Sequence, residues 1–272
     1  PVFSPLKVLV PEAPGTDTIG YSPLILDISN ISQGYLTAVS DSNGTTKNIQ
    51  LSADDGVVYS YFVSSGESAV IPFTSGSDTY QISCYEQVNG SHYAALFAQA
   101  LEVSLENEFL PFLYPNQYVN FTPDSEACKL ALSLLAEDAT EQESIDTVFQ
   151  YVTQHVTYDE DKAATVETGY LPDIDETLST GKGICFDYAA LMTAMLRSRD
   201  IPCKLQIGYA GDIKHAWIDV YIRGKGWVEQ AITYDGEKWN RMDPTFTANS
   251  EDEELINSYI GDSANYTLQF TR

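Results

Sequence analysis

The hydrophobic pattern of this 272-residue chain changes its period near residue 105, and the change limits the chain to two successive kinds of architecture. Residues 1 to about 105 contain short apolar or alternating runs, which are separated by turn sequences such as Ser42-Asn43-Gly44. Alternation with period two is typical of strands with one buried face. The runs lie at 24–28, 57–63, 79–85, 93–97 and 101–105. We therefore expect an all-β, immunoglobulin-like sandwich over residues 1–108.

A helical pattern follows a connector that contains three prolines between residues 111 and 123. Apolar residues recur at helical spacing between 127 and 135, and Asp124 is placed to cap this first helix. Thr140 and Glu143 have the spacing of a capping box, which predicts the start of a second helix.

A long acidic stretch, residues 158–182, has the composition of a loop. Loops of this length in compact domains often carry function, so we expect it to border a substrate groove. Together with the helices before it and the strand patterns after it, this stretch indicates an α+β domain over residues 109–272.

The charge of the chain limits its partners. It has 14 Lys and Arg against 39 Asp and Glu, a formal net charge of −25. Such a field repels phosphate backbones, so we expect no nucleic-acid partner. The acidic side chains are expected to form a solvated surface; attraction to cationic substrates is the alternative.

The apolar runs and the surface composition bear on location. No apolar run approaches the ~20 residues that a membrane-spanning helix needs. The N-terminal third is rich in Ser, Thr, Asn, Gly and Tyr and poor in Lys and Arg. We therefore expect an extracellular or cell-surface protein. Because the chain opens on Pro1, we also expect a processed form from which a signal has been removed.

The four cysteines, Cys84, Cys128, Cys185 and Cys203, predict neither a disulfide scaffold nor a zinc site. They form no C-x-x-C pair, and the three histidines are scattered. The acidic residues near Asp159 lack the register of an EF-hand. No metal and no cofactor is therefore expected.

The segment 181–192 carries the clearest chemical signal. Gly181 and Gly183 immediately precede an apolar helical pattern, so Cys185 falls at or next to the N-terminus of a helix. The unpaired N–H groups and the positive dipole end at that position stabilise a thiolate. Such surroundings lower a thiol pKa from ~8.5 to as little as ~3.5–7.5. Cys185 is therefore the candidate nucleophile, although a free cysteine can also be an inert core residue.

A candidate base and a candidate carboxylate follow on predicted strands. His215 opens an alternating run at 215–222, and Asp243 stands before Pro244 at the end of a later run. Thiol acyl transfer needs a base that reaches the sulfur and a third group that orients the base. Taken singly, His215 could be a structural histidine and Asp243 a turn residue.

The surrounding sequence resembles the transglutaminase-like superfamily, in particular bacterial-type members with an N-terminal β domain. The resemblance rests on landmarks that occur in the family's order over about 130 residues: Gly183-x-Cys185-x-Asp187-Tyr188-Ala189, Ile201-Pro202, Gly208-Tyr209, His215-Ala216-Trp217, Trp227 and Asp243-Pro244. It implies a papain-like core with Cys185, His215 and Asp243 in the triad positions. It does not extend to residues 1–105.

One departure from the family concerns the oxyanion. Animal transglutaminases carry a tryptophan upstream of the nucleophile that helps to hold it, whereas the first tryptophan here is Trp217. The Cys185 backbone N–H is one expected oxyanion donor. Tyr170, in the preceding loop, is our candidate for the second, and Trp217 shares the strand face of His215. We expect Tyr170 and Trp217 to contact substrate.

These expectations define an enzyme and two alternatives. The leading hypothesis is a cysteine peptidase, amidase or protein cross-linking enzyme that acts on a protein or peptide substrate through a Cys-His-Asp triad. The first alternative is a catalytically silent scaffold that binds a cell-wall or surface component through its N-terminal domain. The second is a regulatory domain that presents a peptide-binding groove.

Overall fold

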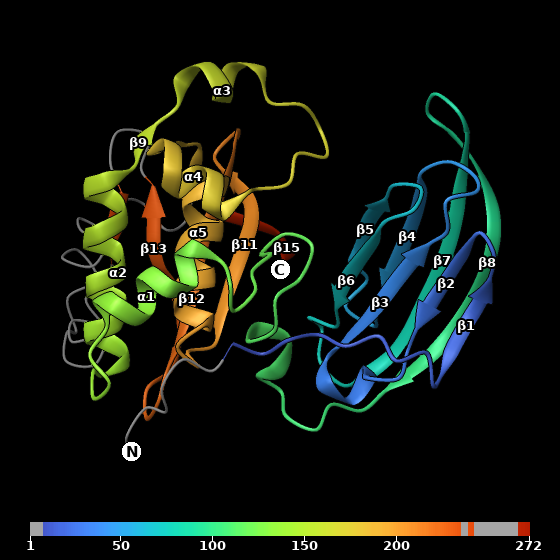
Figure 1. Ribbon diagram of the computed structural model, residues 1–272, viewed down its shortest axis with the longest axis horizontal. Coiled ribbons are helices and arrows are strands. Elements are labelled where there is room, and N and C mark those ends of the chain that lie inside the picture. Colours follow the sequence, from blue (N-terminus) through green and yellow to red (C-terminus); the bar gives the residue numbers. More distant parts are fainter. Residues whose placement is uncertain (1–7, 235–238, 242–265) are drawn as a thin grey trace. The chain divides into compact units, whose positions relative to one another are not determined.

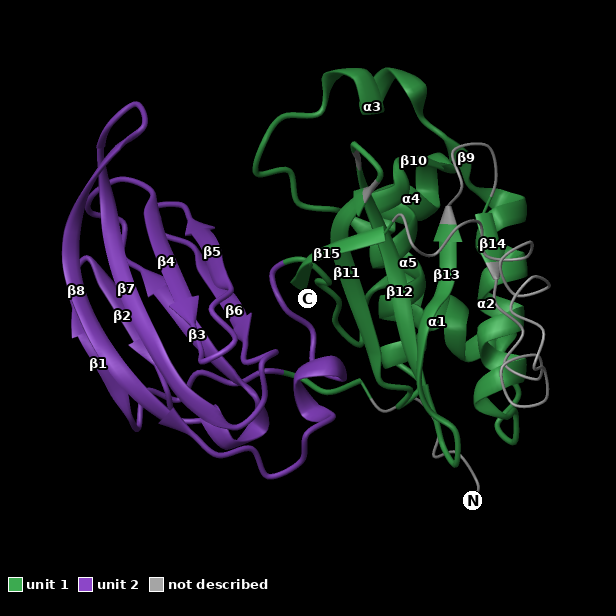
Figure 2. Cartoon of the chain, turned by 180° about the vertical axis from the view of Figure 1, so that it is seen from behind, with its two compact units in different colours: residues 1–10, 118–272 green, residues 11–117 purple. Residues whose placement is uncertain are grey.

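The computed structural model describes residues 8–234, 239–241 and 266–272 of the chain. The chain divides into two compact units (Figure 2): unit 2 is residues 11–117, and unit 1 is residues 1–10 together with 118–272. The boundary that we expected from the sequence, after residue 108, precedes the short 3-10 helix η2 (Leu110–Phe112), which lies within unit 2. None of the helices described is both long and apolar enough to span a bilayer.

Unit 2 consists of two four-stranded antiparallel sheets with the strand orders β1-β2-β3-β6 and β5-β4-β7-β8 (Figure 1). Its strands are β1 (Thr18–Tyr21), β2 (Leu24–Asp27), β3 (Tyr35–Ser40), β4 (Lys47–Ser52), β5 (Val58–Val63), β6 (Ser68–Pro72), β7 (Asp78–Asn89) and β8 (His92–Val103), with the 3-10 helix η1 (Ile31–Gln33) after β2.

The predicted β pattern of this region is confirmed, with two differences. The runs expected at 93–97 and 101–105 belong to one long strand, β8, because β7 pairs with it over almost its whole length. The strands β1, β3, β4 and β6 were not among the predicted runs. The sequence of β4 did not predict a buried strand because its first two residues, Lys47 and Asn48, are polar although both are buried.

Unit 1 contains one antiparallel sheet of five strands in the order β14-β13-β12-β11-β15, together with the helices that cover it (Figure 1). The strands are β11 (Cys203–Ala210), β12 (Ile213–Ile222), β13 (Gly226–Tyr234), β14 (Trp239–Arg241) and β15 (Tyr266–Thr271). The helices are α1 (Glu126–Leu134), α2 (Glu141–His155), α3 (Glu160–Thr165), α4 (Ile174–Thr180) and α5 (Cys185–Arg197). The short strands β9 (Thr157–Tyr158) and β10 (Lys182–Gly183) form a separate parallel pair.

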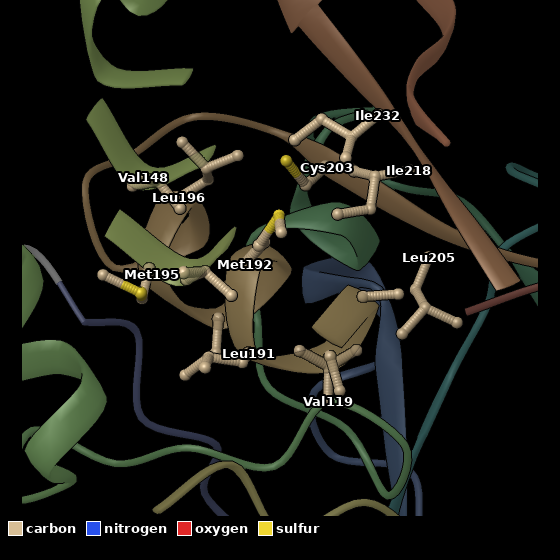
Figure 3. Close-up of a cluster of buried hydrophobic side chains, with 14 of the residues drawn as sticks. Val119, Val148, Leu191, Met192, Met195, Leu196, Cys203, Leu205, Ile218 and Ile232 are labelled. Carbon is tan, nitrogen blue, oxygen red and sulfur yellow. The ribbon is translucent and has the colours of Figure 1, made fainter. Parts of the chain in front are cut away.

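Helix α5 lies at the centre of unit 1. Its residues from 187 to 197 are all buried, and its apolar side chains join those of α1, α2 and β11–β13 in one core cluster (Figure 3). Figure 3 shows Leu191, Met192, Met195 and Leu196 of α5 among side chains of the sheet and of α2. A helix that is apolar on every side is expected in this position, because it has no face suited to water.

The ends of the first two helices are capped in different ways. The capping box predicted at Thr140 and Glu143 is confirmed: each side chain bonds the other residue's backbone N–H, at 3.2 and 2.8 Å. The cap predicted at Asp124 is wrong. Helix α1 begins one residue later, and its first N–H groups bond to the carboxylate of Asp175, which lies on α4.

The stretch 158–182 is not the structureless loop that its composition suggested, because it contains α3, α4 and β10. Its aspartates account for much of this order. Asp159 accepts a bond from the N–H of Lys162 at 2.9 Å, and Asp173 accepts bonds from the first turn of α4 at 3.1 and 2.9 Å. The acidic composition thus reflects helix N-caps, which carboxylates favour.

The central position of α5 yields a stability prediction. Replacing Leu191, which is fully buried, by alanine removes packed atoms and leaves a cavity, so we expect the free energy of unfolding to fall by about 2–5 kcal/mol. Leu132→Ala on α1 is the matched control, because Leu132 is 44% exposed and its loss should change stability by less than about 0.5 kcal/mol. Urea unfolding measures both. Equal effects of the two substitutions would contradict the central packing of α5.

Candidate active site

The start of α5 is fixed by a tight passage from α4. Gly181 ends α4 in the left-handed conformation, with φ +62°, and a Cβ there would lie 2.9 Å from the carbonyl oxygen of His155. Two backbone bonds then tie the passage to β9, from the N–H of Thr157 to Gly181 at 2.9 Å and from the N–H of Asp159 to Gly183 at 3.0 Å. Gly181 and Gly183 therefore allow the tight passage that places Cys185 at the first position of α5, as expected from the sequence.

The sulfur of Cys185 lies beside strand β12. Hydrogen bonds reach it from the backbone amides of Ala216, Phe186 and Cys185 itself. The Ala216 amide belongs to the peptide unit that joins His215 to Ala216. The nucleophile predicted from the glycine pattern and the base predicted from the strand pattern are therefore neighbours in space, although 30 residues separate them in the sequence.

The protonation of the pair differs from the expectation. Burial raises the pKa of the Cys185 thiol above its ordinary value, although the amide hydrogen bonds act in the opposite direction. Burial lowers the pKa of the His215 imidazole below its ordinary value. The low thiol pKa that we predicted from the helix N-terminus is therefore corrected: at this site desolvation outweighs the amides, and at neutral pH both groups rest uncharged.

His215 and Trp217 are on β12, where alternation gives them the same face. In the register with β11, Gly208 stands opposite His215. A Cβ on Gly208 would lie 2.0 Å from the carbonyl oxygen of Thr267 and 2.8 Å from the ring of Trp217. Glycine is thus required here so that β15 and the Trp217 side chain can approach β11. Trp217 is almost fully buried and packs edge-on against Tyr266, with ring centroids 5.2 Å apart.

The predicted third member of the triad, Asp243, lies outside the described residues. The last described residue before it is Arg241, at the end of β14.

Asp219, a carboxylate on the same strand as His215, was not predicted to belong to the site. Asp219 is buried and accepts bonds from the side chain of Gln206 at 2.6 Å and from the backbone N–H of Gln230 at 2.8 Å. Burial raises its pKa. Gln230 has a positive φ of 52° in an irregular part of β13, so Asp219 stabilises the strand bend there. Its position two residues after Trp217, on the same face, was the available signal.

Tyr170 reaches the nucleophile helix from the segment after α3. Its hydroxyl donates to Oδ1 of Asp187 at 2.6 Å, and its ring lies edge-on to that of Phe186, with centroids 6.3 Å apart. Burial, followed by the bond to Asp187, raises the pKa of Tyr170 to about 12. Its contact with substrate, like that of Trp217, stays a prediction.

Asp187 itself is fully buried and lies in the first turn of α5, where its Oδ2 accepts the backbone N–H of Ile184 at 2.9 Å. The same oxygen also lies 2.8 Å from Nζ of Lys162. The contribution of Lys162 was missed, and no local signal marks it, since 25 residues separate the partners.

The other three cysteines differ from Cys185 in their burial. Cys84, Cys128 and Cys203 are buried free thiols. Burial raises the pKa of Cys84 to about 12 and that of Cys128 to about 11. Among the described residues, no group of three or more His, Cys, Asp or Glu side chains is arranged to hold a metal ion.

Comparison with known proteins supports the resemblance stated above. Residues 129–244 match the model of the transglutaminase-like superfamily. Among curated proteins, no significant match was found.

Two solved structures are similar to this chain. One is a candidate cysteine protease from Cytophaga hutchinsonii, 14% identical, with a TM-score of 0.42, over 88% of this chain and 78% of that one. The other is a candidate protease from Parabacteroides distasonis, also 14% identical, with a TM-score of 0.35, over 69% of this chain and 38% of that one. Because these similarities are distant, the resemblance to the superfamily rests on the match at residues 129–244.

The protonation of the site yields a labelling prediction. Alkylation requires the thiolate, so labelling of Cys185 by iodoacetamide should be slow at pH 6. Because burial raises the pKa of this thiol, labelling should rise only at a pH above the usual thiol pKa of ~8.5. Mass spectrometry of the Cys185 peptide against pH measures it. The three buried cysteines, which should stay unlabelled in the folded protein, are internal controls. Rapid labelling at pH 6 that is lost in His215→Ala would instead establish a resting thiolate–imidazolium pair.

Proposed function

We propose that this chain catalyses thiol-dependent acyl transfer on peptide or carboxamide substrates, because residues 129–244 match the model of the transglutaminase-like superfamily. Cys185 is the nucleophile, His215 the base and Asp243 the carboxylate that orients His215. The superfamily and its cysteine-protease neighbours indicate a thiol-dependent hydrolase or transferase. The particular reaction and the triad are our proposal.

One observation carries this proposal. The sulfur at the tip of α5 accepts a hydrogen bond from the amide of Ala216, the residue next to His215. A thiol acyl transferase needs a nucleophile and a base within reach of each other. A buried structural cysteine has no such requirement, and Cys185 differs from the other three cysteines in being partly exposed.

The uncharged resting pair supports a concerted first step. As Sγ of Cys185 attacks the carbonyl carbon, its proton passes to His215, and the resulting imidazolium stabilises the tetrahedral intermediate. The intermediate collapses when His215 returns the proton to the leaving amine, which leaves a thioester on Cys185. Water or a second amine then attacks the thioester with His215 again as base, the C–S bond breaks, and the Cys185 sulfur takes the proton back from His215 as the acid or the new amide leaves. We favour water, which makes the protein a peptidase or amidase; an amine would make it a cross-linking enzyme.

The helix N-terminus supplies part of the electrostatic stabilisation. The N–H groups of Cys185 and Phe186 are directed to the sulfur, and the first N–H groups of a helix lack partners within the helix. We propose the Cys185 N–H as an oxyanion donor. The Tyr170 proton is already donated to Asp187, which leaves the second donor to another group.

Unit 2 is proposed to be an immunoglobulin-like sandwich at the cell surface or outside the cell. Its strand connections support this. β3 leads to β4 in the other sheet, β6 lies beside β3, and β7 lies beside β4. Two sheets linked in this crossing manner are typical of Greek-key sandwiches. A cell-wall or surface component is its proposed partner. Fractionation of cells that produce the protein tests the location.

A silent scaffold is the second candidate, because the resting thiol is not activated by its surroundings. In that case the fold would present a groove without turnover. Substitution of Cys185 separates the two hypotheses, since it removes catalysis but leaves a binding surface in place.

Turnover of a peptide library, read by mass spectrometry with and without an added primary amine, tests the proposed function. Cys185→Ala should abolish both hydrolysis and amine incorporation, and His215→Ala should lower kcat/KM by about 10²–10⁴-fold. His92→Ala is the matched control, because His92 is exposed on unit 2. Binding of peptides by wild type and by Cys185→Ala with equal affinity, and turnover by neither, would establish the scaffold.

The pH dependence of kcat/KM provides a further prediction. The base must be neutral, and burial lowers the pKa of His215. Activity should therefore persist as the pH falls to the usual histidine pKa of ~6.5 and should be lost only below it. Initial rates between pH 4 and 9 measure the acid limb. A midpoint above ~7 would contradict the assignment of a buried neutral imidazole as the base.

A further inference from the structure

Residues 160–171, which we name the strap, stand out from the rest of unit 1 in both views (Figures 1 and 2). The strap comprises α3 and the chain that follows it. Residues 164–169 are exposed, and buried positions resume only at Pro172. A segment with so little buried apolar surface has low local stability unless specific contacts order it.

Two such contacts meet on one carboxylate. Nζ of Lys162 lies 2.8 Å from Oδ2 of Asp187, and the hydroxyl of Tyr170 donates to Oδ1 at 2.6 Å. Nζ of Lys162 also lies 4.5 Å from the centroid of the Tyr170 ring, so the two strap residues contact each other. Lys162 and Tyr170 lie near the two ends of the strap, so their contacts attach both ends to the same residue of α5, Asp187.

The carboxylate is suited to this task by its burial. Asp187 is fully buried, two residues after the nucleophile. A buried carboxylate needs compensating charge and hydrogen bonds, and Lys162, Tyr170 and the Ile184 N–H provide them. Gly183 makes room for it, because a Cβ there would lie 2.7 Å from Cβ of Asp187.

The strap also contacts the first turn of α5, next to Cys185. The Tyr170 ring lies edge-on to Phe186, the residue that follows Cys185, and Phe186 also lies 6.0 Å from the ring of Tyr118. A closed strap therefore places an aromatic side chain next to the residue that carries the sulfur.

We propose that Lys162 and Tyr170 are positioning residues that latch the strap to Asp187, and that the latched strap forms a wall of the acyl-binding site beside Cys185. The latch is a property of the fold. Its effect on substrate rests on the proposed function. With the latch broken, the strap opens, large reagents reach Cys185 more easily, and substrate binding weakens more than the chemical step does.

The test uses three variants of the full chain. Lys162→Met removes the ammonium group and keeps the apolar stem, Tyr170→Phe removes only the hydroxyl, and Lys162→Arg restores a positive charge. Lys129→Met is the matched control, because Lys129 forms an exposed ion pair with Glu126 on α1, at 2.8 Å. Urea unfolding first shows that each variant is folded.

Hydrogen exchange of the strap and alkylation of Cys185 report the latch without any need for turnover. In Lys162→Met and Tyr170→Phe we expect amide exchange in residues 160–171 to become about tenfold faster, since a hydrogen bond to a charged group contributes at least that factor. Labelling of Cys185 by a bulky maleimide should rise by a similar factor, and labelling by iodoacetamide should rise less. Lys162→Arg should restore the wild-type values, and Lys129→Met should not change them.

Kinetics then test the wall. The latch variants should raise KM about tenfold and change kcat less than about threefold. Unchanged strap exchange in both latch variants would overturn the latch. Faster amide exchange in the strap, with unchanged KM and unchanged maleimide labelling, would contradict the proposal that the strap forms a wall of the acyl-binding site. Absence of turnover in the wild type would refute the proposed function alone, since exchange and labelling would still decide the latch.

Discussion

Enclosure of α5 is the constraint on which the rest of unit 1 depends. A helix whose residues from 187 to 197 are all buried must have the polar groups near its two ends satisfied within the protein, because water has little access to them. At one end Asp187 accepts the Ile184 N–H. At the other, the buried guanidinium of Arg197 donates to the carbonyl oxygen of Cys203 at 3.1 and 2.8 Å and to that of Arg272 at 2.9 Å. The strands β11 and β15 are thereby attached to the helix that carries the nucleophile.

The same enclosure sets the chemistry of the site. Burial disfavours the charged form of both Cys185 and His215, and the backbone hydrogen bonds to the sulfur do not reverse this direction for Cys185. In the mechanism proposed above, the thiol proton must therefore move to His215 as the sulfur attacks. A thiol reagent in solution meets little thiolate at Cys185, because the thiolate is the form that reacts.

Local features of unit 1 could be predicted from the sequence, and distant contacts could not. The glycines before Cys185 and the capping box at Thr140 depend on a few neighbouring residues, so the starts of α5 and α2 were predicted correctly. The Asp175 cap of α1 joins residues 48 apart. In unit 2, Lys47 is buried because Glu86 lies 3.3 Å away on another strand. Such pairs appear only after folding, which is why β4 and the strap contacts were missed. The predicted direction of the Cys185 pKa was wrong because burial, which the local sequence does not show, outweighs the amide hydrogen bonds.

The parallel pair β9–β10 has a consequence for how this domain could change over evolution. Because Thr157 and Asp159 bond to Gly181 and Gly183, the chain returns to its starting point after about twenty residues. Loop-closure entropy varies only slowly with length, so the exposed part of that circuit can be exchanged for a longer or shorter one while the nucleophile keeps its support. Such exchange is limited to the residues between Lys162 and Tyr170, because both of these contact the buried Asp187 of α5. A change between them would alter the surroundings of Cys185 without removing the contacts that hold the start of α5.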